Sequence, residues 1–121
     1  MARILIVDDS PTELHILSSI LTKHGHQVNT AGSGEEGVER AKADKPDLIL
    51  MDIVMPGMNG FQATRKISND PETNDIPIIV VTTKDQDTDR MWSLRQGAKE
   101  FLVKPVDEAD LMNKVGTLLA G

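Results

Sequence analysis

Three aspartates, a threonine and a lysine are the residues of this chain whose types and positions best suit chemistry. Asp8 and Asp9, Asp52, Thr82 and Lys104 each end or directly follow a short run of apolar residues. Three carboxylates brought together repel one another and raise each other's pKa unless a cation neutralises them. Mg²⁺ meets this need, because it prefers oxygen ligands, keeps several waters and usually takes one or two carboxylates plus a phosphate oxygen. The set therefore predicts a Mg²⁺ site.

Phosphoryl transfer is the chemistry that such a set can perform. An aspartate beside Mg²⁺ can attack phosphorus and form an aspartyl phosphate. Lys104 and the Thr82 hydroxyl could then neutralise and hydrogen-bond the phosphoryl oxygens. Each residue taken singly has a simpler explanation, since an Asp-Asp pair before a helix often only caps that helix and complements its dipole. The joint arrangement favours the chemistry, because four strands each deliver a suitable group to one edge.

Four short apolar runs at fairly even spacing are typical of strands that are buried on both faces, as in a parallel sheet. These runs are Ile4–Val7, Leu48–Met51, Ile78–Val81 and Phe101–Val103. A fifth run, Gln27–Thr30, is more polar and predicts an edge strand.

Capping and stop signals predict a helix after each strand. A Ser-x-x-Glu box opens the first two helices, and a proline at the first helical position supports the first of them. The predicted helices begin at Ser10, Ser33, Asn59, Asp85 or Asp87, and about Asp107; the first four stop near Gly25, Ala43, Asn69–Pro71 and Gly97. In the fourth helix, Met91 and Leu94 are predicted to face inward, which leaves the Trp92 indole at least partly outward.

Five strands that alternate with five helices predict an α/β fold with a central five-stranded parallel sheet, a doubly wound (βα)5 domain. The flavodoxin-like strand order 2-1-3-4-5 is expected, with ligands binding beyond the carboxyl ends of the strands. A chain of 121 residues predicts a single domain over residues 1–121, without room for an output domain.

The composition excludes several classes of function. A formal charge of −6 and a pI of about 4.9 disfavour nucleic acid or an anionic membrane as the main partner. The absence of cysteine excludes disulfides, thiolate catalysis and zinc-thiolate sites. No apolar run approaches the roughly 18 residues of a membrane span, and no signal-like segment opens the chain, so a cytoplasmic location is expected.

Four motifs give the chain a close resemblance to a known family. They are Val7–Ser10, Leu50–Gly60, Val81–Thr83 and Val103–Pro105. Asp52 lies 30 residues before Thr82 (82 − 52) and 52 residues before Lys104 (104 − 52), as in chemotaxis-type, CheY-like receivers. Over its whole length the chain resembles a response-regulator receiver domain.

This resemblance implies roles for the acidic residues. Asp52 would be the phosphoacceptor, served by a phosphohistidine on a chemotaxis-type histidine kinase or its phosphotransfer domain. Asp9 and Asp52 would ligate Mg²⁺ directly, together with the main-chain carbonyl of Val54, while Asp8 would act mainly through water. The protein would be a signalling switch that catalyses only its own phosphoryl transfer and dephosphorylation, and not an enzyme in the usual sense.

The resemblance also implies how the signal is transmitted. Thr82 and Phe101 match the two switch positions of the family, and Lys104–Pro105 matches a peptide bond that is usually cis. Trp92 and Phe101 would lie on the partner face, the surface formed by the fourth helix, the fifth strand and the fifth helix. An outward tryptophan is a plausible contact there.

Three residues depart from the commonest chemotaxis pattern. Phe101 replaces a tyrosine, and Val54 and Lys84 flank the phosphoryl site where a polar amide and a carboxylate are common. The latter two put the turnover rate in question, but not the phosphorylation itself.

Further segments narrow the resemblance. Thr82–Gln86, Trp92, Arg95–Ala98 and Phe101–Glu108 are similar to the PilH group of twitching-motility regulators. This implies a downstream motility protein in a type IV pilus or chemotaxis-like pathway, although the related PilG group and ordinary chemotaxis regulators share most of the core. A monomer is expected. Whether the protein carries an output signal or acts as a phosphate sink for a shared kinase stays open.

Three rival functions fit the sequence less well. A flavin-binding electron carrier shares the fold, but only 2% of the residues are aromatic and the loops after strands one and three are acidic where a phosphate would sit. A small aspartyl-phosphate phosphatase shares the pocket chemistry, but it needs a substrate cavity and a second acid, and short loops offer neither clearly. A purely structural docking domain would leave the clustered carboxylates unexplained.

Overall fold

Five parallel strands, each followed by a helix, make up residues 1–120, the part of the chain that this computed structural model describes. The strands are β1 (Arg3–Val7), β2 (Gln27–Ala31), β3 (Leu48–Met51), β4 (Ile78–Thr82) and β5 (Glu100–Val103). The helices are α1 (Pro11–Lys23), α2 (Gly34–Asp44), α3 (Gly60–Asn69), α4 (Asp87–Arg95) and α5 (Glu108–Ala120). Every predicted strand and helix is present, and most bounds agree to within one or two residues.

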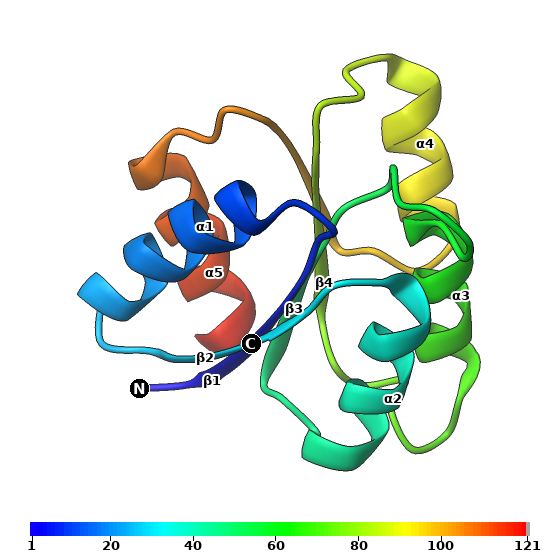
Figure 1. Cartoon of the computed structure of the whole chain (residues 1–121), viewed down its shortest axis with the longest axis horizontal. Coiled ribbons are helices and arrows are strands. Elements are labelled where there is room, and N and C mark those ends of the chain that lie inside the picture. The colour runs from blue at the N-terminus through cyan, green and yellow to red at the C-terminus, as the bar shows by residue number, and fades with distance from the viewer. Residues whose placement is uncertain (121) are drawn as a thin grey trace.

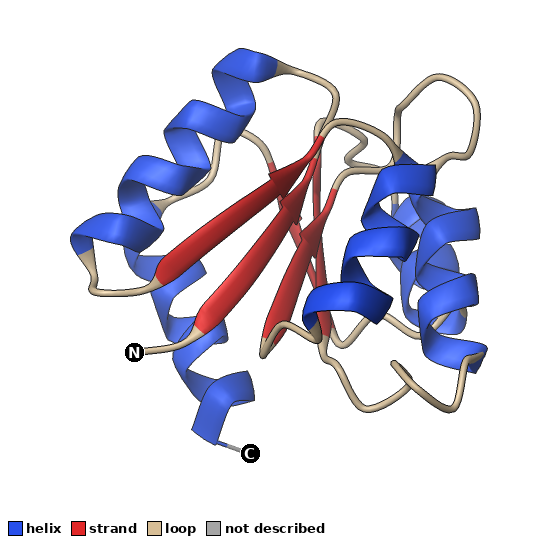
Figure 2. Cartoon of the chain, turned by 60° about the horizontal axis from the view of Figure 1, so that its bottom comes forward, coloured by secondary structure: helices blue, strands red, loops and turns tan. Residues whose placement is uncertain are grey.

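The sheet order is β2-β1-β3-β4-β5, the predicted flavodoxin-like order, and β2 is an edge strand as expected. Helices α1 and α5 cover one face of the sheet, while α2, α3 and α4 cover the other (Figures 1 and 2). The doubly wound α/β prediction is thereby confirmed.

Apolar side chains on both faces of the central strands hold these layers together. Successive residues of a strand point to opposite faces. Leu5 and Val7 therefore join the core under α2 and α3, whereas Ile4 and Ile6 join the core under α1 and α5. All four are at most 1% exposed, and each fully buried side chain of this size contributes about 1.5–3 kcal/mol of transfer free energy.

The predicted caps start the first three helices. The Ser10 and Ser33 hydroxyls accept hydrogen bonds from main-chain N–H groups three residues on, at 3.3 and 3.1 Å. Asn59 and Gln62 form a reciprocal capping box at the start of α3, with both bonds at 2.9 Å. Because each cap follows the loop after a strand, it fixes where the chain leaves the carboxyl edge of the sheet.

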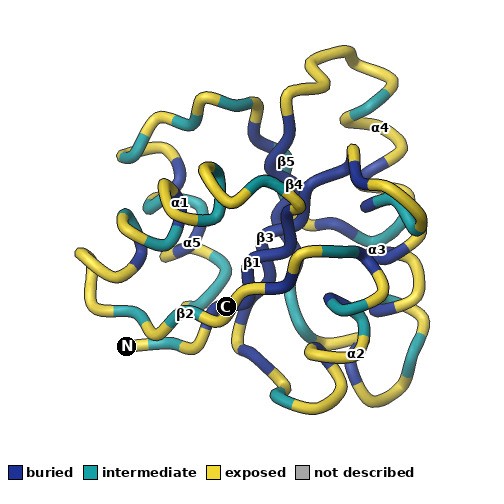
Figure 3. Tube along the Cα trace, viewed as in Figure 1, coloured by how far each residue is buried: buried dark blue, intermediate teal, exposed yellow. Residues whose placement is uncertain are grey.

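Helix α4 differs from the prediction on two points. Met91 and Leu94 do not face inward but are 52% and 37% exposed; the buried residue is Ser93, whose hydroxyl donates to the Asp89 carbonyl at 2.8 Å. Most of the helix is exposed (Figure 3). Neither Asp85 nor Asp87 is the cap residue, because Gln86 directly precedes the helix. The Gln86 N–H instead donates to the Asp89 carboxylate at 3.2 Å.

Both ends of the described chain lie at the amino edge of the sheet (Figure 2). Met1 and Ala2 line a surface hollow together with Leu118 and Leu119 near the end of α5. Among residues 1–120, none of the helices has the length and apolar character required to cross a membrane.

Candidate functional site

Strand register places two of the aspartates side by side. Val7 pairs with Met51 in the β1–β3 ladder, so Asp8 and Asp52 are the next residues on neighbouring strands. The Asp52 N–H donates to the Val7 carbonyl at 3.0 Å, and the Asp8 N–H donates to the Ala31 carbonyl at the same distance. These main-chain bonds extend the ladder by one residue and fix both aspartates at the carboxyl edge.

The same edge receives Lys104 from the far side of the sheet. Thr82 pairs with Val103, and the Lys104 N–H donates to the Thr82 carbonyl at 2.8 Å. The Lys104 Nζ then lies 2.6 Å from Asp8 Oδ2 and 3.6 Å from Asp52 Oδ2. The Lys104 side chain, 6% exposed, therefore joins β5 to the two central strands.

Each buried carboxylate has further hydrogen bonds. Asp8, at 1% exposure, accepts the Ser10 N–H on Oδ1 at 2.9 Å. Asp52, at 7% exposure, accepts the N–H of Ile53 on Oδ1 at 2.8 Å. Oδ2 of Asp52 is thus the oxygen nearer to the ammonium group.

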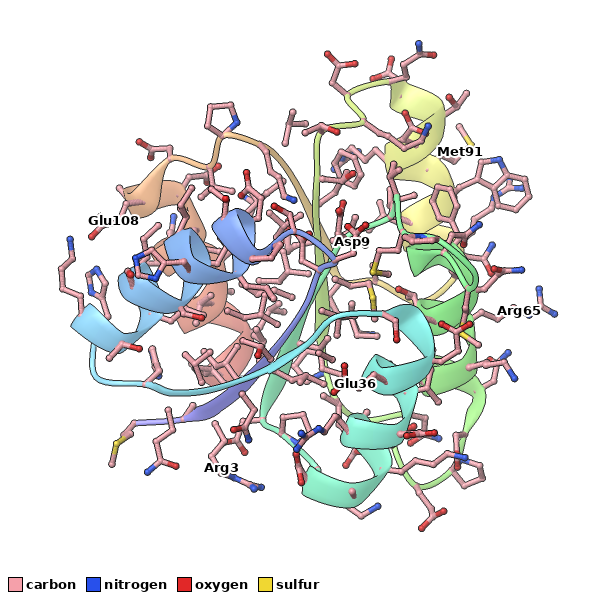
Figure 4. All side chains as sticks on the ribbon, viewed as in Figure 1. Arg3, Asp9, Glu36, Arg65, Met91 and Glu108 are labelled. Carbon is pink, nitrogen blue, oxygen red and sulfur yellow. The ribbon has the colours of Figure 1, made fainter. Side chains whose placement is uncertain are left out.

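The residues present fit a hard divalent cation. Asp8, Asp9 and Asp52 each offer a carboxylate oxygen, and these atoms all lie within 4.8 Å of one another. Three carboxylates outnumber the single ammonium of Lys104, which leaves local negative charge, and the exposed Asp9 keeps the cluster open to water (Figure 4 labels it where β1 meets α1). Oxygen ligands with room for waters are what Mg²⁺ requires.

The pKa values of the Asp52 carboxyl and of the Lys104 ammonium both lie above their ordinary values. Burial raises the pKa of the Asp52 carboxyl; the Lys104 charge opposes this rise and the Asp8 charge adds to it. For Lys104, burial acts to lower the pKa of the ammonium, but the hydrogen bond to Asp8 and the charge of Asp52 outweigh burial, so the pKa lies above its ordinary value. Lys104 thus stays charged, and its charge helps Asp52 to ionise.

The remaining predicted residues lie around this cluster. Thr82 is fully buried, and its Oγ1 accepts the Lys84 N–H at 3.3 Å. The Lys84 ammonium lies 3.8 Å from the carboxylate of Asp89. Val54 is 56% exposed, and its role as a carbonyl ligand stays a prediction. The Lys104–Pro105 bond is cis, as expected.

The two aromatic residues predicted for the partner face lie on β5 and α4. Phe101 is half-buried against the core under α2 and α3. Trp92 is 52% exposed, as predicted, and the Arg95 guanidinium lies 5.8 Å from the centre of its ring. Met91, labelled in Figure 4, belongs to the same exposed helix.

Sequence reasoning missed two contacts of the site. It assigned Lys104 to the phosphoryl oxygens but did not predict that its shortest ion pair is with Asp8. It also missed Glu35, whose carboxylate contacts the loop after Asp52. The capping box Ser33–Glu36 accounted for that stretch of sequence, so Glu35 carried no separate signal.

Comparison with known proteins decides the family. The family model for the response regulator receiver domain matches residues 4–116. The chain belongs to the response-regulator receiver family. As a receiver it is a signalling protein and not a conventional enzyme.

The receiver is 60% identical to protein PilH of Pseudomonas aeruginosa, over 100% of both chains. It is 42% identical to the response regulator PleD of Caulobacter vibrioides, covering 97% of this chain but 26% of PleD. Among solved structures, the receiver domain of the sensor histidine kinase PA1611 from P. aeruginosa has a TM-score of 0.92 at 29% identity, covering 99% of this receiver and 98% of that chain. That structure has a magnesium ion coordinated in its active site cleft.

Proposed function

We propose that this receiver accepts a phosphoryl group on Asp52 from the phosphohistidine of a histidine kinase or its phosphotransfer domain. The observation that carries the proposal is the buried Lys104 ammonium, 2.6 Å from Asp8 and 3.6 Å from Asp52, beside three clustered carboxylates. A structural ion pair would need one acid for one base. The surplus of acid suits a site that gains a cation and then a phosphoryl group.

In the proposed step, Asp52 Oδ2 attacks the phosphorus of the phosphohistidine. A new O–P bond forms as the N–P bond breaks, and the electron pair of that bond returns to the imidazole nitrogen. The Ile53 N–H holds Oδ1, which leaves Oδ2 as the attacking atom. Lys104 and the Thr82 hydroxyl are assigned to the phosphoryl oxygens that gain charge in this step.

Mg²⁺ would be held by Asp9, Asp52 and the Val54 carbonyl, with Asp8 acting through water. When bound, it would supply positive charge opposite the transferred phosphoryl oxygens. Asp8 would orient Lys104, since their hydrogen bond is the shorter of the two ion pairs of that ammonium.

The pathway is proposed from the similarity to PilH. We infer that the receiver works with a chemotaxis-type kinase in the control of type IV pilus twitching. We further propose that it acts in the cytoplasm as a monomer. A phosphate sink for a shared kinase is the alternative; it would have to lose its phosphoryl group rapidly, which an apolar, exposed Val54 beside the site disfavours. Deletion of the gene should change twitching motility, and normal twitching in the deletion strain would contradict this pathway.

Mass spectrometry after treatment with acetyl phosphate tests the chemistry. We expect a gain of one phosphoryl group that requires Mg²⁺ and disappears in Asp52→Asn. The matched control is Asp85→Asn, an exposed aspartate just after the site, which should be labelled as the parent is. Labelling of Asp52→Asn at full yield would show that another residue is the acceptor.

A further inference from the structure

The loop between β3 and α3 follows Asp52 and contains Val54, whose main-chain carbonyl is assigned to the proposed magnesium site. Its base is closed by the Gly60 N–H, which donates to the Ile53 carbonyl at 2.9 Å. Ile53 and Met55 are buried and fix the first half of the loop, whereas Pro56 and Gly57 are exposed. The outer half therefore needs support from outside the loop.

Helix α2 supplies that support through Glu35. The Met58 N–H donates to Glu35 Oε2 at 3.2 Å. A Cβ atom placed on Gly57 would lie 2.9 Å from the same oxygen, so the carboxylate rests against the Gly57 main chain. Within residues 1–120, this is the one hydrogen bond between another element and residues 54–58.

The main chains of the helix and the loop also meet directly. A Cβ on Gly34 would lie 2.5 Å from the Met58 carbonyl oxygen, so the first turn of α2 touches the loop with no side chain between them. Gly57 has a φ of +75°, the left-handed region that favours glycine. This turn directs the Met58 N–H toward α2, and Glu35, Gly57 and Met58 line one groove between α2 and α3.

Capping of α2 does not require Glu35. The Glu36 N–H donates to Ser33 Oγ at 3.1 Å, and Glu36 Oε1 accepts the Gly32 N–H at 2.8 Å (Figure 4 labels Glu36 in the first turn). Ser33 and Glu36 thus complete the helix start, and the Glu35 carboxylate binds the loop instead. A carboxylate in the first turn also suits the helix dipole, which makes this position compatible with the helix.

We propose that Glu35 is a positioning residue for the magnesium site, acting through the loop Ile53–Asn59. By holding the Met58 N–H, Glu35 keeps the outer loop against α2, and with it the Val54 main chain that is assigned to the ion. The inference rests on the proposed function, because it needs Mg²⁺ to bind at Asp9, Asp52 and the Val54 carbonyl. Side chains that orient ligands in this indirect way commonly tune metal affinity.

A Mg²⁺ titration followed by ¹H–¹⁵N NMR tests the inference without any phosphorylation. Glu35→Ala should weaken Mg²⁺ affinity about threefold to tenfold, the effect of losing one hydrogen bond. The Met58 amide proton should shift upfield, since it loses its acceptor. Glu35→Gln keeps an acceptor oxygen and should restore most of the affinity. Glu39→Ala removes an exposed charge one turn further along α2 and should bind as the parent does.

Each outcome bears on a separate claim. Glu35→Ala that binds Mg²⁺ as tightly as the parent overturns the role of Glu35 and leaves the proposed function intact. Glu35→Gln or Glu39→Ala as weak as Glu35→Ala overturns it too, because a loss of charge would then be the cause. A parent chain with no response at Asp9 and Asp52 contradicts the proposed magnesium site itself, and the role of Glu35 with it.

Discussion

We predict that Val54 and Lys84 limit the approach of water to the proposed phosphoryl group. Val54 is 56% exposed beside Asp52 and has no polar side-chain atom that could orient a water molecule. The Lys84 ammonium lies 3.8 Å from Asp89, and a charged ammonium cannot accept a proton from water. At the scale of single residues, the site is therefore better suited to keeping a phosphoryl group than to hydrolysing it.

We expect Val54→Asn to hydrolyse its aspartyl phosphate about threefold to tenfold faster than the parent, because the added amide can hydrogen-bond an attacking water. The measurement is the decay of the phosphorylated mass after the donor is removed. Val54→Ala is the control, since it shortens the side chain without adding a polar atom, and it should decay as slowly as the parent. An Asn variant that decays no faster than the Ala variant would rule out this role of position 54.

The chemistry-bearing residues could be predicted from the sequence because each ends or follows a strand. Asp8, Asp52 and Lys104 needed only the parallel order of the strands to be placed at one edge. The partners within the cluster could not be predicted, because they depend on side-chain reach. Lys104 extends past Asp52 to its shorter contact with Asp8, and no spacing in the sequence encodes that choice.

Helix α4 is the element whose packing the sequence predicted wrongly. Apolar periodicity favoured Met91 and Leu94 for the core, but the inward position is Ser93. The Ser93 hydroxyl donates to the Asp89 carbonyl, so this small side chain can be buried. A hydropathy pattern does not identify such a serine as a buried residue. The four apolar strands carry branched residues, and α1, α2 and α3 begin at cap residues that the sequence marks, so their signals were clearer.

We predict that Thr82 couples phosphorylation to the conformation of the β4–α4 loop and of α4. Thr82 Oγ1 accepts the Lys84 N–H at the start of the β4–α4 loop, so movement of the hydroxyl toward a phosphoryl group would release that loop. Trp92, half-exposed on α4, should report the change by its fluorescence. Thr82→Ala should still accept a phosphoryl group but lose most of the fluorescence response. Phe101 on β5 would move together with Thr82.

Thr83→Ala is the matched control, because it removes an exposed hydroxyl at the adjacent position. It should retain the response of the parent. The proposed route through Thr82 is wrong if Thr82→Ala, once phosphorylated as judged by mass, gives the full Trp92 change. A hundredfold bias between two pre-existing states would require about 2.7 kcal/mol of differential stabilisation.

The stability of the whole molecule should depend on the charge of Asp52. Burial raises its pKa, so the folded chain holds this proton more tightly than the unfolded chain does. The resulting stabilisation is present below the unfolded pKa of about 3.8 and is lost as the pH rises through the folded pKa. Without Mg²⁺, the ionised Asp52 therefore lowers the free energy of unfolding at pH 7.

Asp52→Asn should raise the free energy of unfolding at pH 7 by about 0.5–2 kcal/mol, the usual range for single stabilising substitutions. The gain should shrink at pH 4. Urea unfolding with a chelator present measures both, and Asp85→Asn, on an exposed loop residue, should change little at either pH. A variant that is no more stable than the parent at pH 7 would mean that the Lys104 ion pair fully compensates the buried charge.

The chain ends and the acidic cluster lie on opposite sides of the molecule. Met1 and the last turn of α5 share a hollow at the amino edge, while the acidic cluster lies at the opposite edge of the sheet. A tether, a reporter protein or a surface attached at either end would therefore lie on the side of the molecule away from the acidic cluster. The receiver could thus be immobilised or fused without shielding the acidic pocket from an incoming kinase.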